Sequence, residues 1–431
     1  MIHTHPDSRV RIRKIAALGL AAGLLLTGCG RDNTSAGSTE TAKAIASGAA
    51  TGTINLWAEG AEAQLLPEFL KDFEAKNPGV KVNVTALPWD AAHNKYQTSI
   101  AGGTTPDVAQ MGTTWMSDFS DAFETNPAEI DTSGFFPSSV KSTQVGGASY
   151  GVPWTVDTRV LYYRKDLAAK AGFTEFPTTW DGLKSMAQAL KSQPGVKTGI
   201  QLPVSGADSF QSMLPFLWSN GAKIISDDHS KWTFDTPESV AALKYYQSFF
   251  TDGLADKNPT TGAGAAEAAF VNGTSPVLIA GPGEPAQLDQ AGGPGFQDKY
   301  MVAKFPKEVT GTSFIGGTDL VVFKDGKNRD AAWKLVQWLS QPEVQSNWYK
   351  KSGSLPALQS SWKDPSLAGD KKMAVVVEQL KDTNSPPTVS TWTQVAAAAD
   401  TQLEQIVKAG KDPAAAMKEL QATADSIGTG K

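Results

Sequence analysis

The chain has 431 residues, of which 40% are hydrophobic and 19% are charged. A length of this order is typical of two or three domains, each large enough to bury its own core. The net charge is −5 and no stripe of lysine and arginine runs through the sequence, which excludes a nucleic-acid-binding groove. No apolar run beyond residue 26 is long enough to span a bilayer, so a polytopic membrane protein is also excluded.

The N-terminus has the pattern of an export signal. Basic residues from Arg9 to Lys14 precede an apolar stretch, 15–26, which as a helix covers roughly 18 Å and is too short to cross a bilayer core of about 30 Å. The next segment, Leu26-Thr27-Gly28-Cys29, resembles the bacterial lipobox, whose cysteine is lipidated, and Cys29 is the only cysteine in the chain. We therefore predict a signal peptide over 1–28 and a lipid anchor on Cys29 that holds the protein outside the cytoplasm at the cell membrane. The alternative is a buried thiol in a cytosolic protein.

The segment after the cysteine has no means of building a core. Residues 30–50 are mostly glycine, serine, threonine and alanine, and none is aromatic. Such a composition predicts a flexible tether over 29–50, with folding beginning near Thr51.

The folded part opens with the pattern of a β-α-β unit. Alternation around Ile54 and Leu56 predicts a strand, apolar residues at helical spacing from Leu66 to Phe73 predict a helix, and alternating valines over 80–86 predict a second strand. Helices are predicted after Thr178, after Thr236-Pro237 and after Asp412-Pro413. Strands that alternate with helices over some 380 residues predict an α/β architecture in two lobes.

The common catalytic and cofactor motifs are missing from the sequence. After removal of the signal peptide only His93 and His229 remain as histidines, without a second ligand at metal-binding spacing. There is no nucleophile elbow, no Walker motif and no complete dinucleotide fingerprint. We predict no catalytic residues, no metal and no cofactor.

Tryptophans and carboxylates recur just after the predicted strands, where ligands of α/β sheets bind. A flat aromatic ring beside hydrogen-bond acceptors suits a carbohydrate, which offers apolar C–H faces and many hydroxyls. The residues in these positions are Trp57, Glu59, Trp89, Asp90, Trp115, Trp154 and Asp157. By contrast, Trp333, Trp338 and Trp348 lie within a helical pattern, which predicts packing in the core.

Several longer motifs together resemble one known family. They include Thr53-Ile54-Asn55-Leu56-Trp57, Asn77-Pro78-Gly79, Gly102-Gly103 before Pro106-Asp107-Val108, and Gly151-Val152-Pro153-Trp154, followed in the C-terminal third by segments 316–319, 328–333, 338–345 and 352–356. Their order is similar to that of the maltose-binding-protein-like, family 1 solute-binding lipoproteins of bacterial ABC sugar importers. The resemblance covers nearly all of residues 51–428.

This resemblance implies a two-lobed, periplasmic-binding-protein-like fold of type II, with a ligand cleft between lobes that several chain crossings join. The N-terminal lobe would hold 52–155 and 311–360, and the C-terminal lobe 156–310 and 361–431. The hinge would lie near 153–158 and 305–313.

The resemblance also implies which residues contact the ligand. Carried onto this sequence they are Trp57, Glu59, Trp89, Asp90, Thr114, Trp115, Trp154, Asp157, Arg159, Asn220, Glu284, Gly317, Thr318, Asp319 and Trp392. A structural ion pair is an equally good reading of Arg159. Many relatives carry an aromatic residue where Gly283 stands here, so one stacking surface is missing.

The leading hypothesis is a monomeric, lipid-anchored receptor that binds a mono- to oligosaccharide, such as a disaccharide or short α-glucoside, and delivers it to an ABC permease. Two alternatives stay open. A secreted glycoside hydrolase would use two of the carboxylates as acid and base. A receptor of the same fold would bind a non-sugar solute such as a polyamine or a peptide.

Overall fold

A computed structural model describes residues 42–60, 62–206, 208–262 and 264–430. The predicted signal peptide, Cys29 and most of the predicted tether lie outside these described residues. Within them, no helix is both long enough and apolar enough to cross a membrane.

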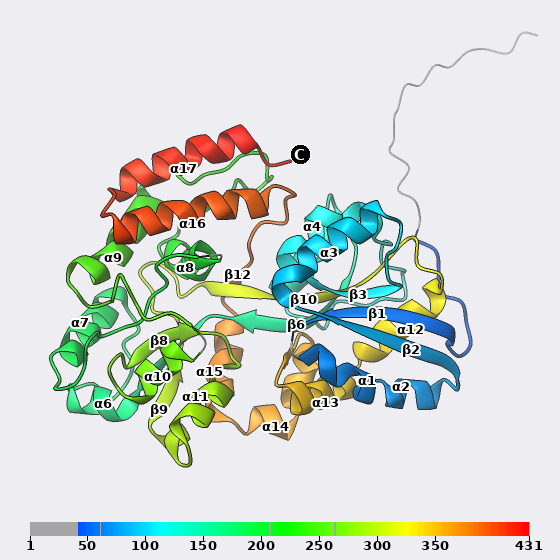
Figure 1. The fold of residues 1–431 in the computed structure, drawn as a ribbon, viewed down its shortest axis with the longest axis horizontal. Helices are drawn as coiled ribbons and strands as arrows, with labels where there is room; N and C mark the ends of the chain where they lie inside the picture. Colours follow the sequence, from blue (N-terminus) through cyan, green and yellow to red (C-terminus); the bar gives the residue numbers. More distant parts are fainter. Residues whose placement is uncertain (1–41, 61, 207, 263, 431) are drawn as a thin grey trace, which may run out of the picture. The chain divides into compact units, whose positions relative to one another are not determined.

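The larger of two main sheets has seven strands in the order β11-β6-β10-β3-β1-β2, with β12 paired to β10 (Figure 1). β1 pairs in parallel with β2 and β3, whereas β10 runs antiparallel to β3 and β6. The predicted β-α-β unit at the start of the chain is therefore confirmed. The strands are β1 (Thr51–Glu59), β2 (Gly79–Leu87), β3 (Val108–Gly112), β6 (Val152–Thr158), β10 (Ser313–Val322), β11 (Leu355–Pro356) and β12 (Thr383–Asn384).

Helices cover both faces of this sheet. One face packs against the helices that carry the buried side chains of Trp333, Trp338 and Trp348, so the predicted packing role of these tryptophans is confirmed. The other face packs against α3 and α4 through an apolar cluster that includes Tyr96 and Phe119. The helices in these segments of the chain are η1 (Glu62–Leu65), α1 (Leu66–Phe69), α2 (Lys71–Lys76), α3 (Trp89–Ala101), η2 (Thr113–Trp115), α4 (Met116–Phe119), η3 (Ser120–Ala122), α5 (Pro137–Ser142), α12 (Arg329–Leu339), α13 (Pro342–Ser352), η5 (Gln359–Lys363) and α14 (Pro365–Ala368). Two short strands, β4 (Gln144–Val145) and β5 (Ala148–Ser149), pair with each other in a separate sheet.

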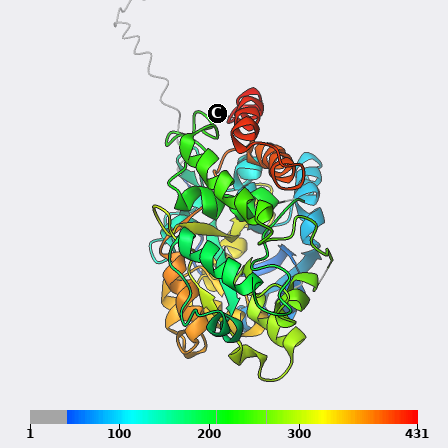
Figure 2. The ribbon, with the colours of Figure 1, turned by 90° about the vertical axis from the view of Figure 1, so that its left-hand side faces the viewer.

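A second, three-stranded antiparallel sheet, β8-β7-β9, organises the other lobe. The helices α16 and α17 pack side by side there, above α8 and α9 (Figure 2). The elements are β7 (Val160–Arg164), α6 (Lys165–Lys170), α7 (Trp180–Lys191), α8 (Ser209–Ser219), α9 (Pro237–Thr251), α10 (Ala265–Val271), β8 (Val277–Ala280), α11 (Glu284–Gly292), η4 (Phe296–Asp298), β9 (Tyr300–Ala303), α15 (Lys371–Leu380), α16 (Trp392–Lys408) and α17 (Pro413–Ile427).

Side-chain caps fix where three of the predicted helices begin. The Thr179 hydroxyl accepts the Gly182 N–H at 3.2 Å, one residue later than the predicted start at Thr178. Thr236 caps α9 and Asp412 caps α17, both as predicted. The predicted helix over 66–73 is instead two short helices, α1 and α2, that meet at a buried Leu70.

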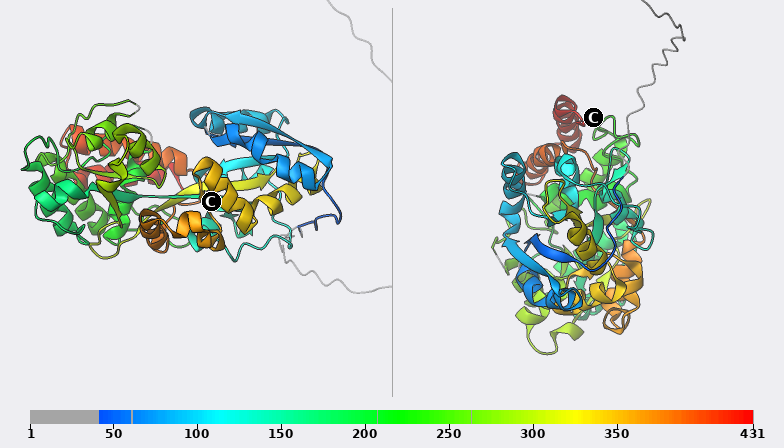
Figure 3. Two further views of the ribbon diagram at one scale, coloured as in Figure 1. Left: turned by 90° about the horizontal axis from the view of Figure 1, so that it is seen from below. Right: turned by 90° about the vertical axis from the view of Figure 1, so that its right-hand side faces the viewer.

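The chain passes between the two sheets more than once. It leaves β6 at Thr158 and enters β7 at Val160, and it returns between Ala303 and Ser313, where β10 begins. A third passage runs from β12 to α16. β6 and β10 lie between the two groups of helices (Figure 3). The first two passages fall at or beside the two stretches that the sequence assigns to the hinge, whereas the third, between β12 and α16, lies outside both.

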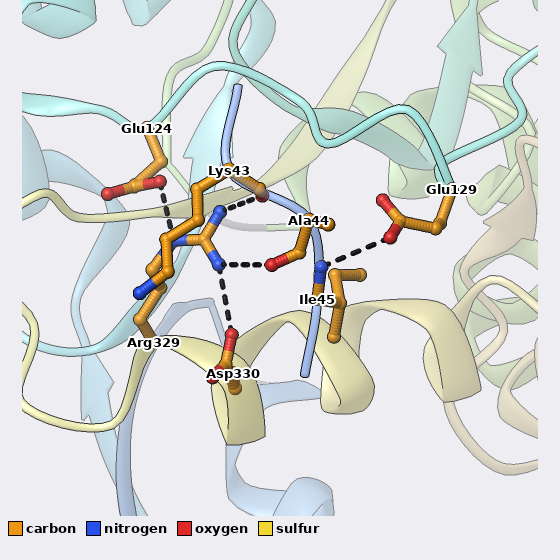
Figure 4. A network of polar contacts seen from close by, with 7 residues as sticks. All are labelled: Lys43, Ala44, Ile45, Glu124, Glu129, Arg329 and Asp330. Carbon is orange, nitrogen blue, oxygen red and sulfur yellow. Dashed lines mark hydrogen bonds and ion pairs between the residues drawn. The ribbon is translucent and has the colours of Figure 1, made fainter. Parts of the chain in front are cut away.

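The last part of the predicted tether is docked rather than free. The Arg329 guanidinium donates to the carbonyls of Lys43 and Ala44 and to the carboxylates of Glu124 and Asp330 (Figure 4). Within the same strap, residues 43–50, Glu129 accepts the N–H of Ile45, and Ala50 is buried in the core. The predicted tether over 29–50 is thus too long by these residues, because backbone carbonyls can be bound whatever the side-chain composition.

We expect Arg329→Gln to release the strap, because the uncharged amide cannot donate to four acceptors. Hydrogen exchange of the Ile45 amide should become faster, and trypsin should cut after Lys43 more readily. Arg159→Gln, remote from the strap, is the matched control. Equal protection of Ile45 in wild type and Arg329→Gln would contradict the role given to this guanidinium.

Candidate functional site

A row of hydrogen-bonded polar side chains links three adjacent strands of the large sheet. The amide of Gln110 on β3 donates to Thr318 on β10 at 3.4 Å, and the hydroxyl of Thr318 lies 2.7 Å from that of Thr155 on β6. Asp157 follows two residues along β6 and therefore lies on the same face as Thr155. Hydroxyl, amide and carboxylate groups of three adjacent strands are thus brought close together.

An aromatic platform adjoins this row. Trp115 lies over Gly112, where a Cβ atom would come within 3.0 Å of the indole, and Gly112 pairs with Thr318. Trp89, which begins α3, contacts Trp115 in a tilted arrangement with ring centroids 4.9 Å apart, and 44% of its surface is exposed. His93 contacts the edge of Trp115 at 5.5 Å. We call Trp89, Trp115 and His93 the aromatic platform; the exposed Trp89 gives it a face for a ligand.

Other predicted residues near this platform differ in their exposure and in their contacts with protein groups. Thr114 is partly exposed in η2, next to Trp115. Asp90 lies in α3, but its side chain falls outside the described part of the chain. Trp57 contacts Tyr96 at 5.9 Å, and Lys95 Nζ lies 5.1 Å from its ring. Trp57 is therefore already contacted by two protein side chains and is only partly exposed, whereas Trp89 is exposed.

Glu59 ends β1 as a fully buried carboxyl group. The Tyr96 hydroxyl lies 2.6 Å from Glu59 Oε1, whereas Oε2 is buried without a hydrogen-bond partner among the described residues. Burial raises the pKa of Glu59 to about 8, outweighing the opposing effect of the Tyr96 hydrogen bond. The group is therefore protonated at neutral pH and can donate a hydrogen bond.

Asp157 and Arg159 form an ion pair where the chain passes between the sheets. The Arg159 guanidinium also lies 5.1 Å above the ring of Phe314. A Cβ atom at Gly281 would come within 2.6 Å of Asp157 Oδ1, so the glycine allows the loop of the other lobe to approach this carboxylate. Arg159 thus forms the structural ion pair, and its side chain is still 21% exposed.

Glu284 begins α11 and is 9% exposed. Burial raises the pKa of Glu284 to about 7, and the negative charge of Glu267 adds to the effect. The adjoining loop is held by the Tyr162 hydroxyl, which donates to the Gly281 carbonyl at 2.8 Å.

Three predicted contacts are buried in the core or remote from this face. Trp154 is 2% exposed and stacks on Trp348 at 5.4 Å, and Trp392 is 2% exposed and packs near Trp232. Asn220 donates to the carbonyl of Glu238. Surrounding side chains enclose both indoles in this conformation, and the ligand contacts that the resemblance implied for Trp154 and Trp392 stay predictions.

Gly317 and Asp319 also have structural roles in place of the implied contacts. Gly317 has φ +126° and a Cβ atom there would lie 2.0 Å from the Thr155 carbonyl oxygen, so only glycine fits. The β6–β10 register then shifts, which leaves Trp154 as the extra residue of a β-bulge. Asp319 is fully buried and accepts the Ser142 hydroxyl at 3.0 Å, and burial raises its pKa to about 8.

The sequence reasoning missed four polar residues near the site. Gln110 lies inside a strand rather than after it, whereas His93 lies one helical turn from Trp89, a spacing that places both on one face of α3. Asp118 accepts a hydrogen bond from His93. Asp208 precedes α8 and has φ 62°. Burial raises the pKa of Asp208, and the nearby charge of Arg159 lowers it by a smaller amount. Only the Trp89–His93 spacing was readable from the sequence.

A groove of about 890 Å³ lies elsewhere, lined by segments 117–121, 141–147, 223–229 and 384–390. None of the predicted site residues lines it. We place the candidate site at the polar row and the platform, because there aromatic and hydrogen-bonding groups converge. Among the described residues no group of three or more histidine, aspartate or glutamate side chains is arranged to hold a metal ion.

Comparisons with known proteins agree on the kind of molecule this is. The family model of bacterial extracellular solute-binding proteins matches residues 57–346. A binding protein of Brucella abortus (strain 2308) is 30% identical over 89% of this chain and 95% of its own length. The diacetylchitobiose binding protein DasA of Streptomyces coelicolor is 26% identical over 94% of this chain and 96% of its own. The solved structure of the sugar-binding protein MalE from Xanthomonas citri superposes with a TM-score of 0.81, at 32% identity over 87% of this chain and 97% of that one.

The chain therefore belongs to the bacterial extracellular solute-binding proteins. Its two-lobed α/β fold of the type II periplasmic-binding class is confirmed by the MalE structure. These relatives are binding proteins, so the expectation of a binding protein rather than an enzyme is confirmed at the level of the family.

The two strongly buried carboxyls give the fold a pH dependence. Glu59 and Asp319 have folded-state pKa values of about 8, far above the ordinary values of 4.5 and 3.8. At a pH between the ordinary pKa values and the raised ones, the folded chain binds more protons than the unfolded chain. The free energy of unfolding should therefore fall as the pH rises from about 4.5 to about 8. Urea unfolding across this pH range should show a smaller decrease in the free energy of unfolding for Glu59→Gln than for wild type. Glu175→Gln, an exposed control, should follow wild type; a Glu59→Gln curve parallel to wild type would contradict the buried acid.

Proposed function

We propose that the protein binds a mono- to oligosaccharide at the aromatic platform and polar row and delivers it to an ABC permease. The observation that carries the proposal is the exposed Trp89 ring packed against Trp115, on the sheet face that also presents Thr155 and Asp157. An exposed indole suits the C–H face of a sugar ring, and the hydroxyl and carboxylate groups suit its hydroxyls.

The relatives support a sugar as the ligand. DasA is named for diacetylchitobiose, another relative from Bacillus subtilis is a galactooligosaccharide-binding protein, and MalE of Xanthomonas citri is a sugar-binding protein. Within this class we propose a disaccharide or short α-glucoside. The ligand contacts in this proposal are Trp57, Glu59, Trp89, Asp90, Thr114, Trp115, Asp157, Arg159, Glu284 and Thr318.

The lobe boundaries and the assembly are part of the same proposal. We assign 52–155 and 311–360 to one lobe and 156–310 and 361–431 to the other, with ligand exchange by bending at the passages between the sheets. The working molecule is a monomer, held outside the cytoplasm by the lipid on Cys29.

A thermal-shift panel tests the ligand class. Maltose, maltotriose, diacetylchitobiose and a galactooligosaccharide represent the sugars, and spermidine and a dipeptide represent the non-sugar alternative. A stabilising shift that grows with the concentration of one of the sugars supports the proposal. Stabilisation by spermidine or the dipeptide alone would refute it, and so would repeated cleavage of a bound sugar, which is the outcome a glycoside hydrolase gives.

We expect Trp89→Ala to weaken binding of the sugar that gives the largest shift by about 2 kcal/mol, roughly thirtyfold in Kd, because an aromatic anchor is lost. Titration calorimetry measures the change. Trp154→Ala is the matched control: it should lower the free energy of unfolding by about 3 to 5 kcal/mol while the folded fraction keeps its Kd. An unchanged Kd for Trp89→Ala would remove the platform from the proposal.

Lipid attachment has its own test. Cys29→Ala removes the thiol that would carry the acyl chains, so the protein should appear in the soluble fraction or remain unprocessed. Fractionation followed by immunoblotting measures this, with Ser35→Ala in the same segment as control. Retention of Cys29→Ala in the membrane fraction would contradict the anchor.

A further inference from the structure

One carboxylate, Asp118 on α4, connects the aromatic platform to the opposite lobe. On its own lobe, Asp118 Oδ2 lies 2.8 Å from His93 Nε2. From the other lobe, the Thr393 hydroxyl at the start of α16 donates to the same oxygen at 3.4 Å. Asp118 therefore interacts with a platform residue and with a residue of the second lobe at once.

The surroundings of this carboxylate hold it in place. Its side chain is 12% exposed, and the buried Oδ1 atom has no hydrogen-bond partner among the described residues. The ring of His93 packs between Trp115 at 5.5 Å and Phe119 at 4.9 Å. A shift of the carboxylate is thus transmitted to the His93 ring, which in turn contacts Trp115.

The two lobes approach each other at this point by contact of α16 with η2, the short helix that contains Trp115. α16 itself packs on α8 and α17 and therefore moves with the second lobe. When α16 moves away, Asp118 loses the hydrogen bond that it accepts from Thr393. Asp118 Oδ2 then keeps His93 as its only hydrogen-bond partner among the described residues.

We propose that Asp118 is a positioning residue that couples the orientation of the aromatic platform to the approach of the two lobes, with His93 as the intermediary. The Thr393–Asp118 contact favours the lobe arrangement seen here, and the same carboxylate fixes the ring of His93 against Trp115. Because coupling is reciprocal, a ligand that orders the platform also favours the approach of α16. The assignment of the platform to sugar binding rests on the proposed function; the coupling itself does not need a sugar.

The test measures the distance between the lobes without added sugar. The only cysteine is Cys29, so spin labels are placed on Asn83→Cys in β2 and Lys408→Cys in α16, in a Cys29→Ala background, and pulsed dipolar spectroscopy gives the distance distribution. The probes are Thr393→Val and Asp118→Ala. Thr401→Val, on the exposed surface of α16, and Asp121→Ala, in η3, are the matched controls.

We expect each probe to reduce the population at the interlobe distance of wild type by about two- to tenfold relative to the remaining states, the effect of one net hydrogen bond. Both controls should match wild type. In the Thr393→Val, Asp118→Ala double variant, the population at the wild-type distance should fall no further than in Asp118→Ala alone, because both changes remove the same contact. Additive losses, or a Thr393→Val distribution equal to that of Thr401→Val, would overturn the proposal.

Tryptophan emission provides the second measurement. Asp118→Ala and His93→Gln should shift the emission of the Trp89–Trp115 pair, recorded against a Trp89→Phe reference, and Asp121→Ala should not. If Asp118→Ala fails to fold, Thr393→Val against Thr401→Val decides the interlobe part and His93→Gln decides the platform part. A panel in which no sugar binds overturns the proposed function while these two results stand.

Discussion

The antiparallel pairing of β6 with β10 is the interaction on which the site depends. These strands carry Thr155, Asp157 and Thr318, and the chain passes from the large sheet to the small one at the end of β6. Gly317 permits an approach that any side chain would block. Trp154 faces the core together with Val152 and Val156, whereas Thr155 and Asp157 alternate with them and lie on the other face. The same pair of strands thus sets both the polar row and the place where bending can occur.

The aromatic platform complements that row because it comes from different elements. Trp89 and His93 come from α3, and Trp115 comes from η2, so three rings are brought together by the packing of helices on the sheet. Apolar stacking and directional hydrogen bonds are then available from adjacent parts of one surface. A neutral, hydroxyl-rich solute requires both, since neither apolar stacking nor hydrogen bonding alone distinguishes a sugar from other amphipathic molecules.

Local patterns in the sequence predicted the local features of the fold. Alternation and helical spacing located the first β-α-β unit, the caps at Thr236 and Asp412, and the packing of Trp333, Trp338 and Trp348. The position of a residue just after a strand was a weaker guide to the candidate site. Trp89 and Trp115 belong to the aromatic platform, whereas Trp154 is buried in the core. The raised pKa of Glu59 comes from burial, against the opposing hydrogen bond from Tyr96, which is distant in sequence, and no local pattern contains that information.

The strap bound by Arg329 shortens the tether that the proposed lipid anchor would have. Attachment of residues 43–45 leaves only 13 residues, 29–41, before the first described residue, in place of the 22 residues of the tether as predicted. A chain of 13 residues extends at most about 45 Å, compared with about 75 Å for 22 residues. With a lipid on Cys29, the leash would keep the receptor within a thin layer above the bilayer and would fix which lobe bears the pull of the anchor. Repeated encounters with a permease in that layer would then be governed by leash length as much as by diffusion in bulk solution.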